Sequence, residues 1–380
     1  MPDSVMRESV LRESETHTLV IGGGVIGCAI AYECAKQGLA VTLLDKGTIG
    51  SEASQAAAGM LGAQVESHHD GPFYELCKAS RDLYRTWTDE LEQISGCSID
   101  YIANGIVRVA LTETDEVELK GRLPWFGDGV KWQTREQLLT LEPTLGEEVR
   151  GGIYFADDHQ VHAPKLSEAL HAALRTLGVR MIENADIQQW LLDEQQSHVR
   201  GVQLADETIM STQTVIAAGA WSQSLLEPFD LHLPIQPVKG QCYAVRPQKP
   251  VIGHTVFTKG CYVVPKLDGS LVIGATEERS GFDKSINPDA VDTIQQTVIK
   301  LLPELARATF ERTWTGLRPA SADGMPFLGK APRWDNLFVA AGHYRNGILL
   351  TPITAKLMSA LLLGQPTTID LKPFAVDRLL

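Results

Sequence analysis

The pattern of apolar and polar positions is clearest near the start of the chain, over residues 18–45. An apolar run at residues 18–21 predicts a buried strand, and a second apolar run ends at Asp45. Between the two runs, apolar positions recur at the spacing of one helix face: Ile26, Ala29, Ile30 and Cys34. A strand, a helix and a strand in close succession predict a βαβ unit, from which doubly wound α/β sheets are built.

The turn between the first strand and the helix carries the pattern Gly22-x-Gly24-x-x-Gly27. Gly22 permits a tight turn, Gly24 lets the backbone approach a pyrophosphate, and Gly27 lets the helix pack closely on the strand. The helix N-terminus offers free N–H groups to phosphates, and Asp45 can accept hydrogen bonds from a ribose diol. The pattern predicts an adenine dinucleotide, and the acidic residue favours FAD or NAD over NADP. The alternative is a βαβ unit whose glycines only form an ordinary turn.

A run of small side chains follows the second strand, over residues 51–60. Small side chains allow the backbone to lie against a large flat ligand, and we therefore expect this run to line the nucleotide site. The alternative interpretation is a plain alanine-rich helix.

Two later apolar runs, at residues 214–218 and 337–341, also lead into glycines, Gly219 and Gly342. Parallel sheets bind their ligands at such strand ends, so we expect both runs to belong to the nucleotide-binding domain. A helix is predicted from about residue 348, and its N-terminus can stabilise negative charge on a ligand.

Residues 231–312 show a different pattern, with strand-like alternation and a hairpin signal at Asp268-Gly269. Three strands are predicted there, at residues 241–245, 256–265 and 270–275, with a helix near 291–302. This antiparallel architecture predicts a separate substrate-binding domain interleaved with the nucleotide-binding domain. The substrate-binding domain is expected to comprise residues 73–150 and 226–312. The nucleotide-binding domain is expected to comprise residues 17–72, 151–225 and 313–380, after a flexible extension at residues 1–16.

The formal net charge of −13 over 380 residues argues against a nucleic-acid partner. No apolar run reaches the roughly 18 residues of a membrane helix, and the polar first segment lacks the apolar core of a secretory signal. We therefore expect a cytoplasmic protein without membrane attachment. The six cysteines form no CxxC pair and are expected to be reduced.

The stretch DDHQVH at residues 157–162 contains residue types that bind metal ions. A solvated polar turn that caps the next helix is the interpretation we favour, so no metal site is predicted. Arg318 and Arg345 lie in loops bracketed by glycine or proline, where a guanidinium can bind a carboxylate in the bidentate manner. The alternative for each is an ordinary surface arginine. His343, beside a glycine turn, is not assigned as a catalytic base, and no other acid or base is assigned.

Six stretches of the chain together resemble the glycine oxidases: IGGGVIGCAIAYECAKQG, SQAAAGMLGA, PVKGQCYAV, CYVVPKLDGSLVIGAT, GLRPASADGMPFLG and AAGHYRNGILLTP. The glycine oxidases are FAD-dependent amine oxidases of the D-amino-acid oxidase family that serve thiamine biosynthesis. The resemblance runs from about residue 17 to the last residue, and GLRP followed by GH-aromatic-RNG is its most specific part. It implies an α/β fold, α+β overall, in which a Rossmann-type FAD-binding domain is interleaved with an antiparallel-sheet substrate domain.

The resemblance also implies site residues. Arg318 matches the arginine that holds the substrate carboxylate, Arg345 a second substrate-contacting position, and Tyr262 the active-site tyrosine near that carboxylate. The implied FAD contacts are Val25, Ile26, Asp45, Lys46, Ala53, Ser54, Ala58, Gly59, Met60, Ile187, His343, Tyr344, Arg345, Asn346, Gly347, Ile348 and Leu349. The FAD is expected to be non-covalent, because no cysteine lies in the segment where sarcosine oxidases attach their flavin.

Two positions depart from the family pattern. Glu277 stands where a glycine oxidase that the chain resembles has methionine, and Gly260 stands where that relative has histidine, two residues before the tyrosine. Both are expected near the substrate entrance, and Glu277 is therefore included among the substrate-binding candidates. Its carboxylate either tunes the choice of amine or is simply solvated at the mouth of the site.

The reaction implied by the resemblance is the oxidative deamination of glycine, sarcosine and small D-amino acids. Hydride passes from the neutral amine to flavin N5, dioxygen is reduced to hydrogen peroxide, and the imine can be handed to a thiazole-forming enzyme. The family also implies a homotetramer. The alternatives are a D-amino-acid or N-methyl-amino-acid dehydrogenase that passes electrons to another carrier, and a non-catalytic nucleotide-binding protein.

Overall fold

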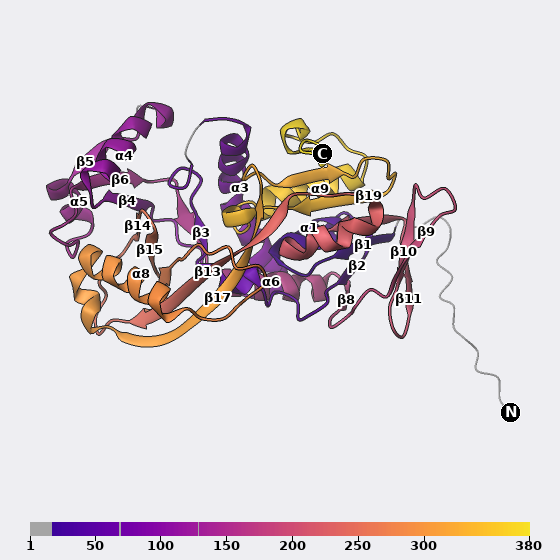
Figure 1. The fold of residues 1–380 in the computed structure, drawn as a ribbon, viewed down its shortest axis with the longest axis horizontal. Coiled ribbons are helices and arrows are strands. Elements are labelled where there is room, and N and C mark those ends of the chain that lie inside the picture. The colour runs from indigo at the N-terminus through magenta and orange to yellow at the C-terminus, as the bar shows by residue number, and fades with distance from the viewer. Residues whose placement is uncertain (1–16, 68–69, 128) are drawn as a thin grey trace.

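The computed structural model describes residues 17–67, 70–127 and 129–380, so the predicted extension at residues 1–16 lies outside the described residues. Two lobes, each built on one large sheet, lie side by side, and the long strands β13 (Ile235–Arg246) and β17 (Thr309–Ser321) run between them (Figure 1). Among the described residues, no helix has the length and apolar character needed to cross a bilayer.

The first lobe contains a six-stranded sheet. Its strands in spatial order are β18 (Phe327–Lys330), β19 (Leu337–Ala341), β12 (Gln213–Ile216), β1 (His17–Ile21), β2 (Ala40–Leu44) and β8 (Arg180–Ile182). All neighbours pair in parallel except β18, which pairs antiparallel with β19 at the edge. Together with α1 (Val25–Lys36), strands β1 and β2 form the βαβ unit expected from the apolar pattern, which is confirmed.

Both faces of this sheet are covered, which explains why its strands read as continuous apolar runs. On one face, Val20 packs in the core formed with α1, α3 (Pro72–Ser95), α6 (Ala163–Thr176) and α9 (Thr351–Leu362). On the other face, Leu19 and Ile21 pack against β10 (Val199–Gln203) and β11 (Thr208–Met210). These two strands and β9 (Gln189–Leu192) form a separate three-stranded sheet.

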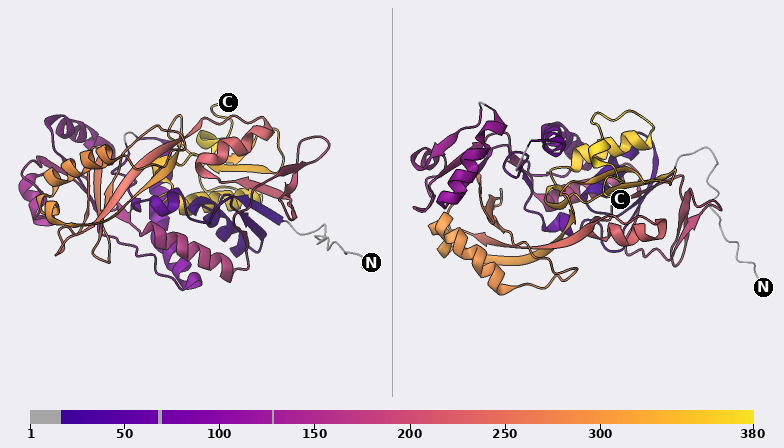
Figure 2. Two further views of the ribbon diagram at one scale, coloured as in Figure 1. Left: turned by 60° about the horizontal axis from the view of Figure 1, so that its bottom comes forward. Right: turned by 45° about the horizontal axis from the view of Figure 1, so that its top comes forward.

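The second lobe contains an eight-stranded sheet whose pairs are antiparallel except for β14 and β4. Its strands in spatial order are β17, β13, β16 (Leu271–Gly274), β15 (Cys261–Pro265), β14 (Thr255–Thr258), β4 (Ile106–Ala110), β6 (Gly151–Phe155) and β5 (Trp132–Thr134). Figure 2 shows the helices of this lobe gathered at the end away from the three-stranded sheet. They are α4 (Glu113–Phe126), α5 (Arg135–Leu141) and α8 (Pro288–Leu301).

Alternation along β15 decides which side chains reach the space between the lobes. Cys261 and Val263 point to the core formed with α8, whereas Tyr262 and Val264 point to the opposite face. A strand places successive side chains on opposite faces of its sheet. The fold therefore presents Tyr262 toward the first lobe.

The predicted α/β class, with its parallel dinucleotide-type sheet and its antiparallel companion, is confirmed. Three elements lie elsewhere than the predicted domain boundaries imply. Helix α3, expected in the substrate-binding domain, packs in the first lobe through residues such as Leu76 and Trp87. Strand β6 and residues 313–321 of β17 were assigned to the nucleotide-binding domain, yet both strands are hydrogen-bonded members of the second lobe's sheet. The cause is long-range pairing, which local periodicity does not reveal.

The single strand predicted at residues 256–265 is wrong. The chain forms two antiparallel strands, β14 and β15, joined by a turn in which Gly260 has a φ of +77°. A backbone conformation of this kind suits glycine, so the residue that departs from the family pattern is the one that closes this hairpin.

Candidate active site

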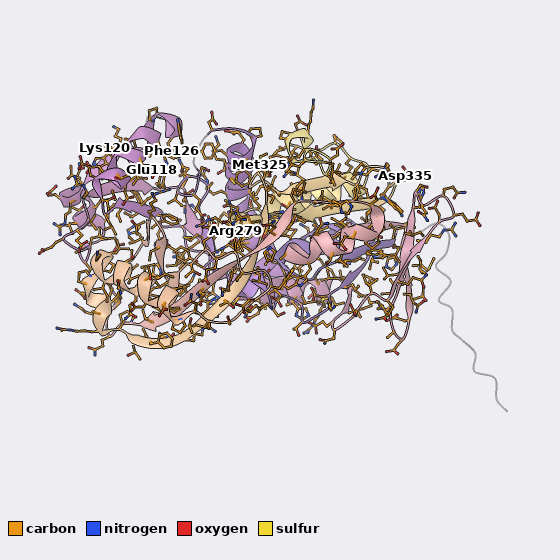
Figure 3. The ribbon with its side chains drawn as sticks, in the orientation of Figure 1. Glu118, Lys120, Phe126, Arg279, Met325 and Asp335 are labelled. Atoms are coloured by element: carbon orange, nitrogen blue, oxygen red, sulfur yellow. The ribbon has the colours of Figure 1, made fainter. Side chains whose placement is uncertain are left out.

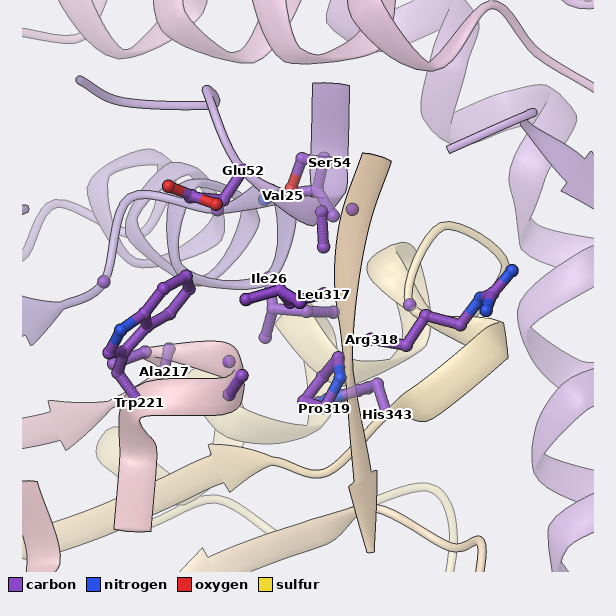
Figure 4. Close-up of a pocket in the computed structure, with 18 of the residues that line it drawn as sticks. Val25, Ile26, Glu52, Ser54, Ala217, Trp221, Leu317, Arg318, Pro319 and His343 are labelled. Atoms are coloured by element: carbon purple, nitrogen blue, oxygen red, sulfur yellow. Dashed lines mark hydrogen bonds between the residues drawn. The ribbon is translucent and has the colours of Figure 1, made fainter. Parts of the chain in front are cut away.

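A cavity of about 500 Å³ lies between the two sheets, at the carboxyl ends of β1, β2 and β12. Both lobes contribute to its walls. Figure 4 shows Glu52 and Trp221 toward one end and Arg318 toward the other, with the strand β17 passing between them. Lys284 of the second lobe pairs with Glu52 (Nζ to Oε1, 2.6 Å) and so joins the two lobes beside the cavity.

The glycine turn forms one wall of this cavity. Gly22 has a φ of +109°, and a Cβ built there would lie 2.4 Å from the carbonyl oxygen of Ala217. A Cβ at Gly27 would lie 1.8 Å from the carbonyl oxygen of Gly22, so helix α1 packs on β1 only because residue 27 has no side chain. Gly24, directly before α1, carries no side-chain cap. This wall has the shape and the backbone donors that a pyrophosphate requires.

Asp45 lies just beyond the end of β2 and lines the same cavity. Its carboxylate accepts hydrogen bonds from the backbone N–H groups of Gly23 (2.6 Å) and Gly47 (2.7 Å). These bonds hold the carboxylate beside the glycine turn, where the ribose of a dinucleotide is expected. The residues present therefore fit an adenine dinucleotide.

The small residues after β2 line the cavity rather than form a long helix. Helix α2 (Ala53–Ala56) is one turn long, and Ala57 is already extended. Ser54 accepts a hydrogen bond from the backbone N–H of Val25 (2.9 Å), which ties α2 to the start of α1. Gly59 has a φ of +86°, and a Cβ there would lie 1.9 Å from the carbonyl oxygen of Val161. The run is small because backbone from another segment lies directly against it.

Lys266 supports this run from the second lobe. Its buried Nζ donates to the carbonyl oxygen of Ala58 (2.7 Å), to Gln160 Oε1 (3.0 Å) and to the carbonyl oxygen of Val161 (3.1 Å). Burial lowers the pKa of Lys266 to about 7. Sequence reasoning missed this residue, because an isolated lysine after a strand carries no local signal of burial.

The low pKa of Lys266 makes the stability of the fold depend on pH. An unfolded chain holds its lysine protons up to a pKa of about 10.4, so between roughly pH 7 and 10 it binds more protons than the folded chain. The free energy of unfolding should therefore rise with pH across this window, by up to about 1.4 kcal/mol per pH unit from this site. We expect Lys266→Met to remove that rise in urea titrations. Lys300→Met, at an exposed position, is the control, and equal slopes in the two variants would contradict the role of Lys266.

Arg318 reaches the cavity from β17, and its guanidinium lies over Gly240 of the neighbouring strand. A Cβ at residue 240 would come within 2.4 Å of both terminal nitrogens of Arg318. Nη1 donates to the carbonyl oxygen of Thr276 (3.1 Å), and no carboxylate in the described part of the chain forms an ion pair with this guanidinium. Arg318 therefore offers its positive charge to the cavity, and Gly240 makes room for it.

Tyr262 is buried beside the same wall, with its hydroxyl 3.4 Å from the Sγ of Cys242. Burial raises its pKa well above the ordinary value of a phenol, and the nearby Arg318 opposes that shift only in part. The hydroxyl therefore stays protonated at neutral pH and can donate a hydrogen bond to an anion in the cavity.

Arg345, which also lines the cavity, is paired with carboxylates. Its Nε donates to Glu66 Oε2 (2.8 Å), and its Nη1 lies 3.5 Å from Glu277 Oε2. Glu66 lines the cavity as well, and sequence reasoning did not identify it. Nothing in the local pattern around residue 66 indicates that a residue almost 280 positions away is its partner.

His343 is buried next to the cavity and shares a hydrogen bond with the hydroxyl of Thr354 (3.0 Å). Burial lowers the pKa of His343 to about 3, so its imidazole is neutral at physiological pH. The helix predicted from about residue 348 begins later, at Thr351 (α9), after a short 3-10 turn at Tyr344–Asn346. The N-terminus of this helix therefore lies later in the chain than predicted.

The predicted site residues as a whole divide into two groups, those that line the cavity and those that do not. Predicted residues that line the cavity are Gly22, Gly24, Val25, Ile26, Asp45, Lys46, Ala53, Ser54, Ala58, Gly59, Met60, Ile187, Gly219, Tyr262, Arg318, His343, Tyr344, Arg345, Gly347 and Ile348. Predicted residues outside that lining are Gly27, Glu277, Asn346 and Leu349. Lys46 reaches its rim, where its Nζ pairs with Asp186 (3.2 Å) in an exposed position.

The DDHQVH stretch caps the next helix as expected, because His162 Nδ1 accepts a hydrogen bond from the backbone N–H of Lys165 (3.3 Å), but it is not a solvated turn throughout. Asp158 is fully buried and accepts hydrogen bonds from the backbone N–H groups of Gln64 (2.9 Å) and Val65 (2.7 Å). Burial raises the pKa of Asp158 to about 7. The described residues contain no group of three or more acidic, histidine or cysteine side chains placed to hold a metal ion. This carboxylate instead anchors the loop that carries Glu66.

Comparisons with known proteins agree with this geometry. Residues 17–361 match the family described as FAD dependent oxidoreductase. The glycine oxidase of Geobacillus kaustophilus is 38% identical over 364 residues, which cover 94% of this chain and 96% of the relative. Its crystal structure has a TM-score of 0.92 and covers 96% of this chain and 100% of that one. The bifunctional protein ThiO/ThiG of a Nostoc species is 37% identical, over 95% of this chain and 54% of the relative.

Proposed function

The chain belongs to the family of FAD-dependent oxidoreductases to which the glycine oxidases belong, and we propose that it oxidises glycine and other small amines with dioxygen. The family predicted from the sequence motifs and the FAD cofactor are thereby confirmed. Under the proposal, glycine, water and dioxygen are converted into glyoxylate, ammonia and hydrogen peroxide. Sarcosine and small D-amino acids are the other expected substrates.

The observation that supports this proposal most strongly is the position of Arg318. A guanidinium without an acidic partner in the described structure lies in the cavity whose other end fits a dinucleotide. Such a group binds a carboxylate by charge-assisted hydrogen bonds. The protonated hydroxyl of Tyr262, in the same wall, is placed to donate a further bond to that carboxylate. Two contacts to one carboxylate would fix the orientation of a small amino acid.

No histidine or tyrosine of the described site is free to accept a proton from the substrate, and the lining carboxylate of Glu66 is held by Arg345. His343 is neutral but buried against Thr354, and Tyr262 holds its proton. We therefore propose that the substrate reacts as the neutral amine and that the protein acts by orientation. FAD, when bound, supplies the acceptor for the two electrons. The site residues hold the carboxylate, direct the α-carbon along the cavity and keep bulk water away.

The test is hydrogen peroxide release by the purified FAD-loaded protein in air. Glycine, sarcosine, D-alanine and D-proline are the substrates to compare, with L-alanine as the stereochemical control. We expect peroxide with glycine among the best substrates. Bleaching of the flavin absorbance near 450 nm without peroxide would favour the alternative, a dehydrogenase that uses another acceptor. Neither bleaching nor peroxide with any amine would remove the proposed function.

We also propose that the imine product supplies thiazole formation in thiamine biosynthesis. The supporting finding is the relative named ThiO/ThiG, which is described as bifunctional and of which this chain matches about half. A chain that carries two activities keeps the product of one close to the other, which suits an imine that water destroys. Trapping of the imine by a thiazole-forming enzyme, at the expense of free glyoxylate, is the result expected of a coupled assay.

A further inference from the structure

A cluster of four side chains, Glu66, Glu277, Tyr344 and Arg345, stands beside the arginine that faces the cavity. Glu277 follows β16 and lies outside the cavity lining, yet its carboxylate contacts the hydroxyl of Tyr344 and lies 3.5 Å from Nη1 of Arg345. Arg345 in turn donates to Glu66 at 2.8 Å. Tyr344, Arg345 and Glu66 all line the cavity. Glu277 therefore touches the site through two residues that form its wall.

The two arginines of the site, Arg318 and Arg345, do not offer two free positive charges to a ligand. The side chain of Arg345 is 30% exposed and contacts two carboxylates. That of Glu66 is 10% exposed and that of Glu277 is 52% exposed, so one carboxylate is largely buried and the other faces solvent. Arg345 is thus neutralised, whereas Arg318 has no acidic partner in the described structure. The site consequently offers one uncompensated positive charge, enough for one carboxylate.

Other cations near the cluster are not part of the cavity lining. Arg108 is buried, lies over the ring of Phe257 and donates to the carbonyl oxygen of Val65, and Arg122 is paired with Glu118 on α4. In Figure 3, Glu118 lies toward the outer end of the second lobe, whereas Arg279, which follows the Glu277–Glu278 pair along the chain, lies near the middle where the lobes meet. A second anionic group on a substrate would therefore meet Glu277 and Glu66 rather than a free cation.

We propose that Glu277 is a specificity-determining positioning residue, which holds Tyr344 and Arg345 in a closed cluster and so restricts the site to amines with a single carboxylate. The physical basis is repulsion: like charges brought together in a binding site lower affinity for the wrong ligand more than they affect the right one. This inference rests on the proposed function, because it concerns the choice among amine substrates. It also decides between the two interpretations that the sequence left open for Glu277, a residue that tunes the choice of amine and a carboxylate that is simply solvated.

The test compares two secondary amines that differ by one carboxylate, sarcosine and iminodiacetate. We expect Glu277→Gln and Glu277→Met to raise the ratio of kcat/KM for iminodiacetate over sarcosine about tenfold, as expected for removal of one half-exposed like charge. Glu277→Asp should retain most of the discrimination of the native protein. Glu278→Gln is the matched control, because its carboxylate bonds to Gln241 and Lys239 away from this cluster, and it should leave the ratio unchanged.

A second measurement does not depend on turnover. Binding of acetate and of malonate to the FAD-loaded protein is followed through the perturbation of the flavin absorbance. Glu277→Gln should tighten malonate about tenfold relative to acetate. An unchanged ratio, or an equal loss for both anions and both amines, would overturn the inference. If the native protein oxidises no amine, the proposed function fails, and the malonate-to-acetate ratio still decides for or against the role of Glu277.

Discussion

Replacing Arg318 with alanine should lower kcat/KM for glycine by roughly 10²- to 10³-fold while the protein keeps its FAD. Within the described residues the guanidinium donates a hydrogen bond to the carbonyl oxygen of Thr276 and forms no ion pair, and it faces the cavity, so its loss leaves the substrate carboxylate without its counter-charge. Truncating one partner of a hydrogen-bonded charge pair costs about 2–5 kcal/mol, and each 1.4 kcal/mol corresponds to a factor of ten. Initial rates of peroxide release and the flavin-to-protein absorbance ratio measure both parts of the prediction.

Arg312→Ala is the control for Arg318, because Arg312 belongs to the same strand but is exposed and lies over the ring of Trp314. It should retain the native kcat/KM.

Gly240→Ala tests the position of the Arg318 guanidinium, since a Cβ at residue 240 displaces the guanidinium without removing it. We expect this variant to lose activity and to regain none at saturating glycine if the displaced arginine no longer orients the substrate. Native activity in Arg318→Ala would exclude Arg318 from the site.

Gly59→Ala should abolish retention of FAD. The backbone of Gly59 has a φ of +86°, and its Cβ would lie 1.9 Å from a carbonyl oxygen of the backbone of Val161. A methyl group there must push the segment that lines the cavity out of its place. Strain and overpacking of this kind cost about 1–3 kcal/mol each. Gel filtration followed by the flavin-to-protein absorbance ratio measures cofactor retention, and urea denaturation of the apoprotein measures stability.

Gly47→Ala is the matched control for Gly59→Ala. Gly47 also lines the cavity, but the nearest atom to its built Cβ is a carboxylate oxygen of Asp45 at 3.6 Å, an ordinary contact. This variant should keep its FAD and its stability within about 0.5 kcal/mol, as is usual for substitutions that disturb no special contact. Full flavin content in Gly59→Ala would show that the 57–60 segment can move without loss of the site.

The parts of the site that are local in sequence were predictable. The glycine turn, the apolar strand β2 just before Asp45 and the hairpin at Asp268-Gly269 each follow from a local apolar pattern or from the conformational freedom of glycine. The motifs around Arg318 and His343 indicated the family, which supplied the roles proposed for them. None of these inferences needs a contact between distant residues.

Contacts between distant residues account for what could not be predicted. The pairing of Glu66 with Arg345, the seat of Arg318 over Gly240 and the three acceptors around Lys266 join segments that only the packed lobes bring together. Neither the periodicity of apolar residues nor the spacing of motifs predicts such pairs.

The sequence by itself thus determined the dinucleotide-binding unit, the cofactor family and the presence of two arginines, because glycine patterns and alternation act over a few residues. The tertiary structure alone decided which arginine is free. Arg345 is neutralised by Glu66 and Glu277, whereas Arg318 stays available, since charge compensation depends on distances between side chains and not on their order in the chain.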